Sequence, residues 1–187
     1  MGATADIDQL PRRPVYRSEY EALGRQGAFD DESVELLDGR IVYSAEEGPP
    51  HADMATRLAR LFIESIPADA GDVRIGNPIA ISDLSEPEPD LFVTTPRQSY
   101  RAAHPTTATL VIEVSQTSRR RDLGAKAALY ASAEIPDYWV VDLTGDRIVV
   151  HRDPSGPRFA SVTSVRDGIL IPLHHPDVRV DVMALLR

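Results

Sequence analysis

The sequence predicts an α/β fold in which helices flank a mixed β-sheet, with an N-terminal β-hairpin and additional C-terminal strands. Three observations support this fold class. Asp38-Gly39 joins two β-prone runs, which is a strong short-range signal for a hairpin. Two longer segments have the apolar spacing or the composition of helices, and several short apolar runs have the composition of strands. The order hairpin, helix, strands, helix, strands is typical of a sheet with helices packed on it.

The length and composition of the chain fit one domain. We expect a flexible arm over residues 1–14, followed by a single domain over residues 15–187. No apolar run approaches the roughly 20 residues that a membrane helix needs, and the first residues lack the apolar segment of a secretion signal. The absence of cysteine excludes disulfides and thiolate metal sites. We therefore expect a cytoplasmic protein with no membrane partner.

The net charge of −9, from 29 acids and 20 bases, argues against broad nonspecific affinity for nucleic acid. It leaves room for a local basic groove. The densest basic cluster is Arg119-Arg120-Arg121, and such a run is more typical of a solvated helix start than of a phosphate site.

The hairpin pairs residues 34–37 with residues 40–43. Counting outward from the Asp-Gly turn places Glu35 opposite Val42. Glu35 therefore lies in the middle of a strand, opposite an apolar residue, which is an unusual place for an acid. An outward-facing edge position and a functional position are both open for this residue.

Two longer helices are expected. The first follows His51 and ends at Pro67. Its apolar residues form one stripe at helical spacing: Met54, Leu58, Leu61, Phe62 and Ile66. The second covers residues 119–133, which are rich in Ala, Leu, Arg and Lys. A shorter helix is expected over residues 19–26, with Ser18 as its N-cap.

The remaining segments are predicted strands. In chain order they cover residues 73–81, 90–93, 109–115, 138–143, 147–151, 159–165 and 169–170. Pro78 restricts the first of them to an edge or a bulge. Residues 178–186 complete the chain, first extended and then as one helical turn.

Glu113 lies within residues 109–115, a run that otherwise suits a buried strand. Burying an ionised carboxylate costs several kcal/mol unless a cation or hydrogen-bond donors compensate it. Glu113 is therefore either exposed at the end of the strand or paired. Alternation places Val111, Glu113 and Ser115 on one face, so the acid can point into a cleft rather than into the core.

Asp90 and Glu113 form a candidate metal site. Asp90 begins one predicted strand and Glu113 lies near the end of the next, so pairing of these strands can bring both carboxylates to one cation. Hard oxygen ligands suit Mg²⁺ or Mn²⁺. A metal held in this way can activate water and stabilise charge on a phosphodiester.

Lys126 is a candidate third member of the site. In the predicted helix it shares one face with Asp122 and Tyr130, at i, i+4 and i+8. If this face lies over the end of the strand, the Lys126 ammonium reaches the carboxylates and helps to orient water or the scissile phosphate. A surface pair between Asp122 and Lys126 explains the same spacing, and the sequence leaves this alternative open.

Six segments of the sequence stand in a characteristic order and spacing. They are Glu35-Leu36-Leu37-Asp38-Gly39 with Ile41-Val42, His51, Pro89-Asp90, Ile112-Glu113-Val114-Ser115, Asp122 with Lys126 and Tyr130, and Asp137-Tyr138-Trp139-Val140-Val141-Asp142. Together they resemble the Uma-type family of restriction endonucleases in the PD-(D/E)XK nuclease superfamily, from about Tyr16 to Asp153. The resemblance implies a restriction-endonuclease-like fold and a metal-dependent endonuclease that hydrolyses DNA phosphodiester bonds.

The resemblance also implies roles for individual residues. Asp90 and Glu113 would hold Mg²⁺ or Mn²⁺, with help from the backbone carbonyl of Val114. The superfamily lysine usually stands two residues after the second acid, where this chain has Ser115. In the Uma-type branch the lysine comes from the following helix, and Lys126 matches that place.

Further roles follow from the same resemblance. Glu35 would contact metal-bound water, and His51 would bind a phosphate with a helix N-terminus behind it. A helix-capping or loop role for His51 stays open. Ser115 and Tyr130 are additional candidates for contact with the substrate.

DNA is thus the expected substrate. A homodimer is expected because cutting both strands of a duplex commonly needs two sites. Two alternatives stay open. The fold can serve as a non-hydrolytic module that binds nucleic acid or protein, which the charge of −9 and Ser115 favour. It can also serve as a hydrolase of small phosphate esters or nucleotides, which suit an acidic protein better than long DNA does.

Overall fold

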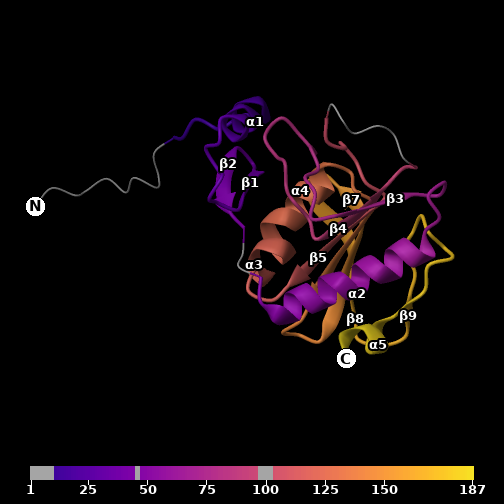
Figure 1. Ribbon diagram of the computed structural model, residues 1–187. Helices are drawn as coiled ribbons and strands as arrows, with labels where there is room; N and C mark the ends of the chain where they lie inside the picture. The colour runs from indigo at the N-terminus through magenta and orange to yellow at the C-terminus, as the bar shows by residue number, and fades with distance from the viewer. Residues whose placement is uncertain (1–10, 45–46, 97–102) are drawn as a thin grey trace, which may run out of the picture.

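The computed structural model describes residues 11–44, 47–96 and 103–187. Its centre is a six-stranded sheet in the order β3-β4-β5-β6-β7-β8 (Figure 1). The strands are β3 (Asp72–Ile75), β4 (Leu91–Thr94), β5 (Leu110–Ser115), β6 (Asp137–Asp142), β7 (Arg147–Ser155) and β8 (Arg158–Val165). Residues 1–10 of the predicted arm lie outside the described residues.

β5 and β6 are parallel, whereas the other neighbouring strands of this sheet are antiparallel. A parallel pair needs a long crossover, because the chain must return to the edge from which the first strand started. The crossover consists of α3 (Arg119–Arg121), η2 (Asp122–Lys126) and α4 (Ala127–Ser132). The second predicted helix is therefore present, although η2 is a π-helix.

Three further helices are α1 (Arg17–Arg25), α2 (Pro49–Ser65) and α5 (Val182–Leu186). Two small sheets pair β1 (Val34–Leu37) with β2 (Arg40–Tyr43), and β9 (Ile169–Leu170) with β10 (Val180–Asp181). The β1–β2 register places Glu35 opposite Val42, as predicted. Asp38 and Gly39 take φ angles of 49° and 70°, which a two-residue hairpin turn of this kind requires.

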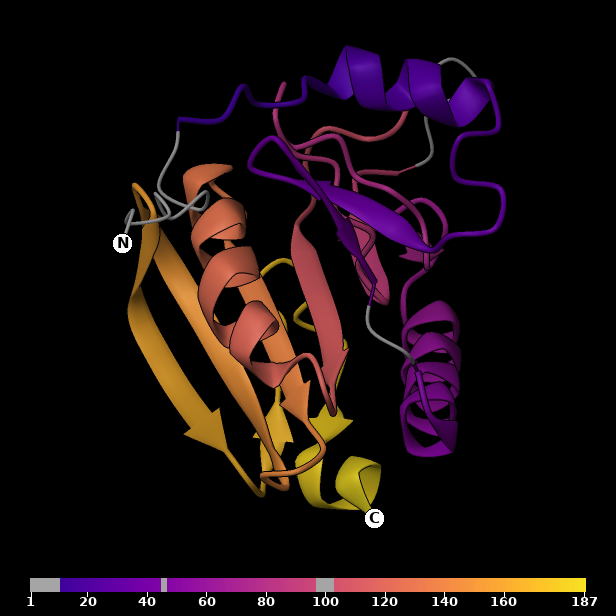
Figure 2. The same cartoon turned by 90° about the vertical axis from the view of Figure 1, so that its left-hand side faces the viewer.

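Helices cover both faces of the six-stranded sheet, as the positions of α2 and α4 in Figure 2 show. α2 and α5 pack on the face that carries Leu110 and Ile112. α4 packs on the opposite face, where Val111 and Tyr130 belong to a second core. Side chains alternate along β5, so Glu113 lies on the α4 face.

Three local predictions are wrong. The helix predicted to follow His51 begins at Pro49, so His51 lies inside α2. The N-cap of α1 is Tyr16 rather than Ser18, and the Glu19 carboxylate accepts the Tyr16 backbone N–H at 3.0 Å. The predicted strand over residues 73–81 ends at Ile75, because a glycine with positive φ and a proline without an N–H follow. In the described part of the chain, no helix is long and apolar enough to cross a membrane.

Candidate functional site

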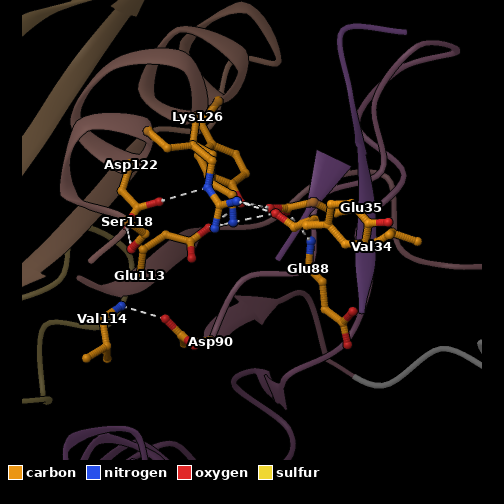
Figure 3. A network of polar contacts seen from close by, with 12 residues as sticks. Val34, Glu35, Glu88, Asp90, Glu113, Val114, Ser118, Asp122 and Lys126 are labelled. Carbon is orange, nitrogen blue, oxygen red and sulfur yellow. Dashed lines mark hydrogen bonds and ion pairs between the residues drawn. The ribbon is translucent and has the colours of Figure 1, made fainter. Parts of the chain in front are cut away.

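A cleft of about 130 Å³ opens between the β1–β2 hairpin, the start of α2, the adjoining ends of β4 and β5, and η2. Its titratable lining residues are Glu35, Glu47, His51, Glu88, Asp90, Glu113, Arg121, Asp122 and Lys126. Segments far apart in the sequence therefore contribute to one polar site (Figure 3).

Glu113 is buried and paired. Its exposed fraction is 4%, and its Oε1 accepts hydrogen bonds from the Lys126 ammonium and the Tyr130 hydroxyl, both at 2.9 Å. Both donors come from the crossover, because η2 and α4 lie over the face of β5 that carries Glu113. The surface-pair alternative for Lys126 is wrong, since this residue is 3% exposed.

Lys126 connects Glu113 to the hairpin. Its Nζ lies 3.0 Å from Glu35 Oε2 and 2.9 Å from Glu113 Oε1. Glu35 is 2% exposed and accepts the backbone N–H of Glu88 at 3.3 Å. The Arg121 Nη1 atom lies 3.5 Å from the other oxygen of Glu35. Glu35 therefore points inward, and the outward-facing edge alternative is wrong.

Asp90 stands at the entrance of β4, next to the end of β5. Its Oδ2 accepts the backbone N–H of Val114 at 2.6 Å, and its Oδ1 lies 3.2 Å from His51 Nε2. The antiparallel pairing of β4 with β5 brings Asp90 and Glu113 to the same cleft. The Val114 amide thus orients Asp90, while coordination by the Val114 carbonyl stays a prediction.

The π-helix η2 contributes a side chain to the cleft from each of its ends. Asp122, at its start, is 1% exposed, accepts a hydrogen bond from the Ser118 hydroxyl and lies 3.8 Å from Arg121 Nε. Lys126 stands at its end. The Tyr138 hydroxyl donates to the main-chain carbonyl of Asp122 at 2.9 Å, which ties η2 to β6. Such π-turns occur frequently at functional sites.

The electrostatics of the cleft favour a bound cation. Burial raises the pKa of Glu113 to about 8; Lys126 opposes this shift, and Asp90 adds to it. Burial lowers the pKa of Lys126, but Glu113 and Glu35 outweigh this effect and raise it. Burial also raises the pKa of Asp122. The acids that line the cleft outnumber its cations, and a set of carboxylate oxygens in this setting fits Mg²⁺ or Mn²⁺.

Ser115 and Tyr130 lie behind the cleft rather than in its lining. Both are fully buried. Tyr130 orients Glu113 through its hydroxyl, and Ser115 follows Glu113 on the same face of β5. Contact of Ser115 or Tyr130 with the substrate stays a prediction.

Three charged residues of the cleft are not indicated by the motifs. Glu47 stands four residues before His51, and Glu88 stands two residues before Asp90. Their closeness in sequence to predicted site residues is the feature that could have indicated them. Arg121 belongs to the run that was expected to be solvated, but it lines the cleft. One arginine of that run therefore faces the site. Tertiary packing decides which of the three it is, because it sets how the helix is rotated about its axis.

Comparison with known proteins decides the family. A family model for Uma2, described as "Putative restriction endonuclease", matches residues 17–181. The chain belongs to the Uma2 family. This match confirms the resemblance that the motifs carry. The comparison of this Uma2 chain with curated proteins finds no match.

A solved structure supports the fold of the Uma2 chain. The protein described as "a putative nuclease belonging to DUF820", from Anabaena variabilis ATCC 29413, aligns with a TM-score of 0.70 at 14% identity. The alignment covers 92% of this chain and 98% of that chain. At this identity the likeness shows the fold alone. It confirms the predicted fold, a mixed sheet flanked by helices.

Proposed function

We propose that this Uma2 protein is a divalent-metal-dependent endonuclease that hydrolyses DNA phosphodiester bonds. The convergence of Glu35, Asp90, Glu113 and Lys126 in one cleft, from four separate segments of the chain, is the observation that supports it best. Lys126 approaches Glu113 from η2, which provides the ammonium that Ser115 cannot supply. Membership of the Uma2 family supports the same class of reaction.

In this proposal Asp90 and Glu113 hold Mg²⁺ or Mn²⁺, with the Val114 carbonyl as a further ligand. When bound, the ion stabilises negative charge on the phosphodiester and lowers the pKa of water. The Val114 N–H occupies Asp90 Oδ2, so Oδ1, which also faces His51 Nε2 at 3.2 Å, is the oxygen that would bind the ion. Lys126 and Tyr130 both contact Glu113 through Oε1, which leaves Oε2 for the ion.

Lys126 positions water or the phosphate. An ammonium has three N–H donors, and the contacts with Glu113 and Glu35 use two of them. No residue in the described part of the chain takes the third donor, which would bind a phosphate oxygen or the attacking water. Glu35 holds the ammonium from the hairpin side, and the Tyr130 hydroxyl holds Glu113 from beneath. These contacts fix the charge before the substrate arrives.

Cleavage assays test the proposal on supercoiled, linear and single-stranded DNA with Mg²⁺ or Mn²⁺. We expect the wild type to cleave and EDTA to abolish cleavage. Asp90→Asn and Glu113→Gln should each lose about 10²-fold or more, because each removes a charge that stabilises the transition state through the metal. Glu64→Gln, which changes an exposed acid of α2, is the control and should cleave like the wild type.

Two outcomes contradict the proposal. One is an absence of cleavage on all three substrates; DNA binding without cleavage would then favour the non-hydrolytic module. The other is unchanged cleavage in both cleft variants.

The proposal includes a homodimer, because two symmetric sites can cut both strands of a duplex. Light scattering should give twice the mass of one chain, and a monomer at assay concentration contradicts this part.

A further inference from the structure

His51, in the first turn of α2, lies between two carboxylates. Its Nε2 is 3.2 Å from Asp90 Oδ1, and its Nδ1 is 3.5 Å from Glu47 Oε2. Glu47, His51 and Asp90 each offer one ligand atom, and these atoms lie within 4.8 Å of one another. The three residues form a donor group on the α2 side of the cleft.

The His51 ring is buried in this group and incompletely bonded. The residue is 7% exposed, and its Nδ1 makes no hydrogen bond to any described residue. A neutral imidazole that directs Nδ1–H toward Glu47 turns the lone pair of Nε2 toward Asp90. At 3.2 Å, Nε2 and Asp90 Oδ1 form a hydrogen-bonded pair when Nε2 carries a proton, and they are spaced as two ligands of one ion when a metal ion replaces that proton. The arrangement thus leaves a place for a cation.

Phosphate binding, the role that the sequence suggested for His51, fits these surroundings poorly. α2 begins with Pro49 and Pro50, so its first two positions have no N–H to offer an anion. Asp90 and Glu47 flank the ring and repel a phosphate. The surroundings of His51 therefore favour a cation.

We propose that His51 Nε2 and Asp90 Oδ1 are ligands of one divalent cation, and that Glu47, whose Oε2 lies 3.5 Å from Nδ1, accepts the Nδ1 proton when the cation is bound. Metal-bound histidines almost always donate their second N–H to a carboxylate, a carbonyl or water. A nitrogen ligand favours a first-row transition ion over Mg²⁺, which prefers oxygen. The site therefore takes Mn²⁺ in preference to Mg²⁺. This inference rests on the proposed function only in assigning Asp90 to the metal.

The experiment uses the full-length protein with MnCl₂ and no DNA. Electron spin echo envelope modulation of the bound Mn²⁺ detects a coordinated ¹⁴N nucleus. We expect this modulation in the wild type and its loss in His51→Ala. His174→Ala, which removes an exposed histidine outside the cleft, is the matched control and should retain it.

Calorimetric titration tests the metal preference. His51→Ala should bind Mn²⁺ about tenfold more weakly or worse, while its Mg²⁺ binding changes less than about threefold. Glu47→Gln should keep the ¹⁴N modulation and bind Mn²⁺ about tenfold more weakly, as expected for a residue that positions a ligand. His51→Asn replaces His51→Ala if circular dichroism shows that the alanine variant is unfolded.

The outcomes separate this inference from the proposed function. Mn²⁺ that binds the wild type without ¹⁴N modulation overturns the inference alone, as does modulation that persists in His51→Ala. A wild-type protein that binds neither Mn²⁺ nor Mg²⁺ overturns the inference and the metal-dependent nuclease together.

Discussion

At the scale of single residues, buried acids occur outside the cleft as well as inside it. Glu86 is 5% exposed, and its backbone N–H donates to the Leu36 carbonyl of β1 at 2.8 Å. Its carboxylate lies 3.9 Å from Arg17 Nη1 of α1. Burial raises the pKa of Glu86 to about 7; nearby Glu21 adds to this shift, and Arg17 opposes it. Glu86 therefore keeps its proton in the folded protein at pH values where the unfolded chain has released it.

This difference makes stability depend on pH. Between pH 4.5 and about 7 the folded state binds more protons at Glu86, so the free energy of unfolding falls as the pH rises through this window. Glu86→Gln removes this loss of stability, because the glutamine side chain does not titrate. From about pH 5 to about pH 8 we expect the variant to gain on the order of 1 to 3 kcal/mol relative to the wild type. Urea unfolding at both pH values measures this gain. The prediction is contradicted if the difference in free energy of unfolding between variant and wild type is the same at the two pH values.

The residues of the site are predictable to different degrees. Regular spacing indicates Lys126 and Tyr130, because one helix face carries both, and strand alternation indicates the face of Glu113. Glu47 and Glu88 lie in loops. Their approach to the cleft depends on the path of the loop, which no periodic pattern encodes.

At the scale of elements, the crossover between β5 and β6 determines where Lys126 stands. Composition predicts a helix over residues 119–133, and the structure contains it. The π-turn within it is not predictable, because its causes are tertiary. The Tyr138 hydroxyl of β6 bonds the Asp122 carbonyl, and the side chains of Asp122 and Lys126 are both buried.

Gly124 is the exposed glycine of this π-turn and provides a test of its backbone. A Cβ added at Gly124 meets no atom within 4 Å, and its φ is not positive. Gly124→Ala should therefore stabilise the protein by about 0.5 to 1 kcal/mol, because alanine loses less backbone entropy on folding. Denaturant unfolding measures this gain, and a clear loss of stability contradicts it.

Gly39→Ala is the contrasting variant. Gly39 has a φ of 70°, and an added Cβ lies 2.5 Å from Pro14 Cβ. This change should destabilise the hairpin by about 1 to 3 kcal/mol. Because β1 carries Glu35, we also expect weaker cleavage in Gly39→Ala but not in Gly124→Ala. Equal effects of the two substitutions would contradict the assignment of turn and helix.

At the scale of the whole molecule, the cleft forms where separate layers meet. The six-stranded sheet supplies Asp90 and Glu113, the crossover supplies Lys126, and the β1–β2 hairpin supplies Glu35 from outside that sheet. The order of elements predicts the layers, and the motifs predict the residues. Neither predicts that the hairpin lies beside the strand ends, because its position depends on long-range contacts such as the Glu86 N–H with the Leu36 carbonyl and Lys126 with Glu35.

The charge of the molecule is consistent with this arrangement. With a net charge of −9 and an acidic cleft, the protein repels a phosphodiester until cations offset the carboxylates. Lys126 and Arg121 supply part of this positive charge. In the proposed function a divalent ion would supply the rest, so DNA binding at the cleft would depend on metal binding.

The central claim is that Asp90 and Glu113 hold one metal ion in this cleft. A crystal structure of the protein with Mn²⁺ tests it most directly, through the anomalous scattering of the ion. We predict one anomalous peak within about 2.0 to 2.6 Å of carboxylate oxygens of both residues, with Lys126 still paired to Glu113. A peak that contacts neither acid, or a cleft without a peak when Mn²⁺ is saturating, contradicts the account.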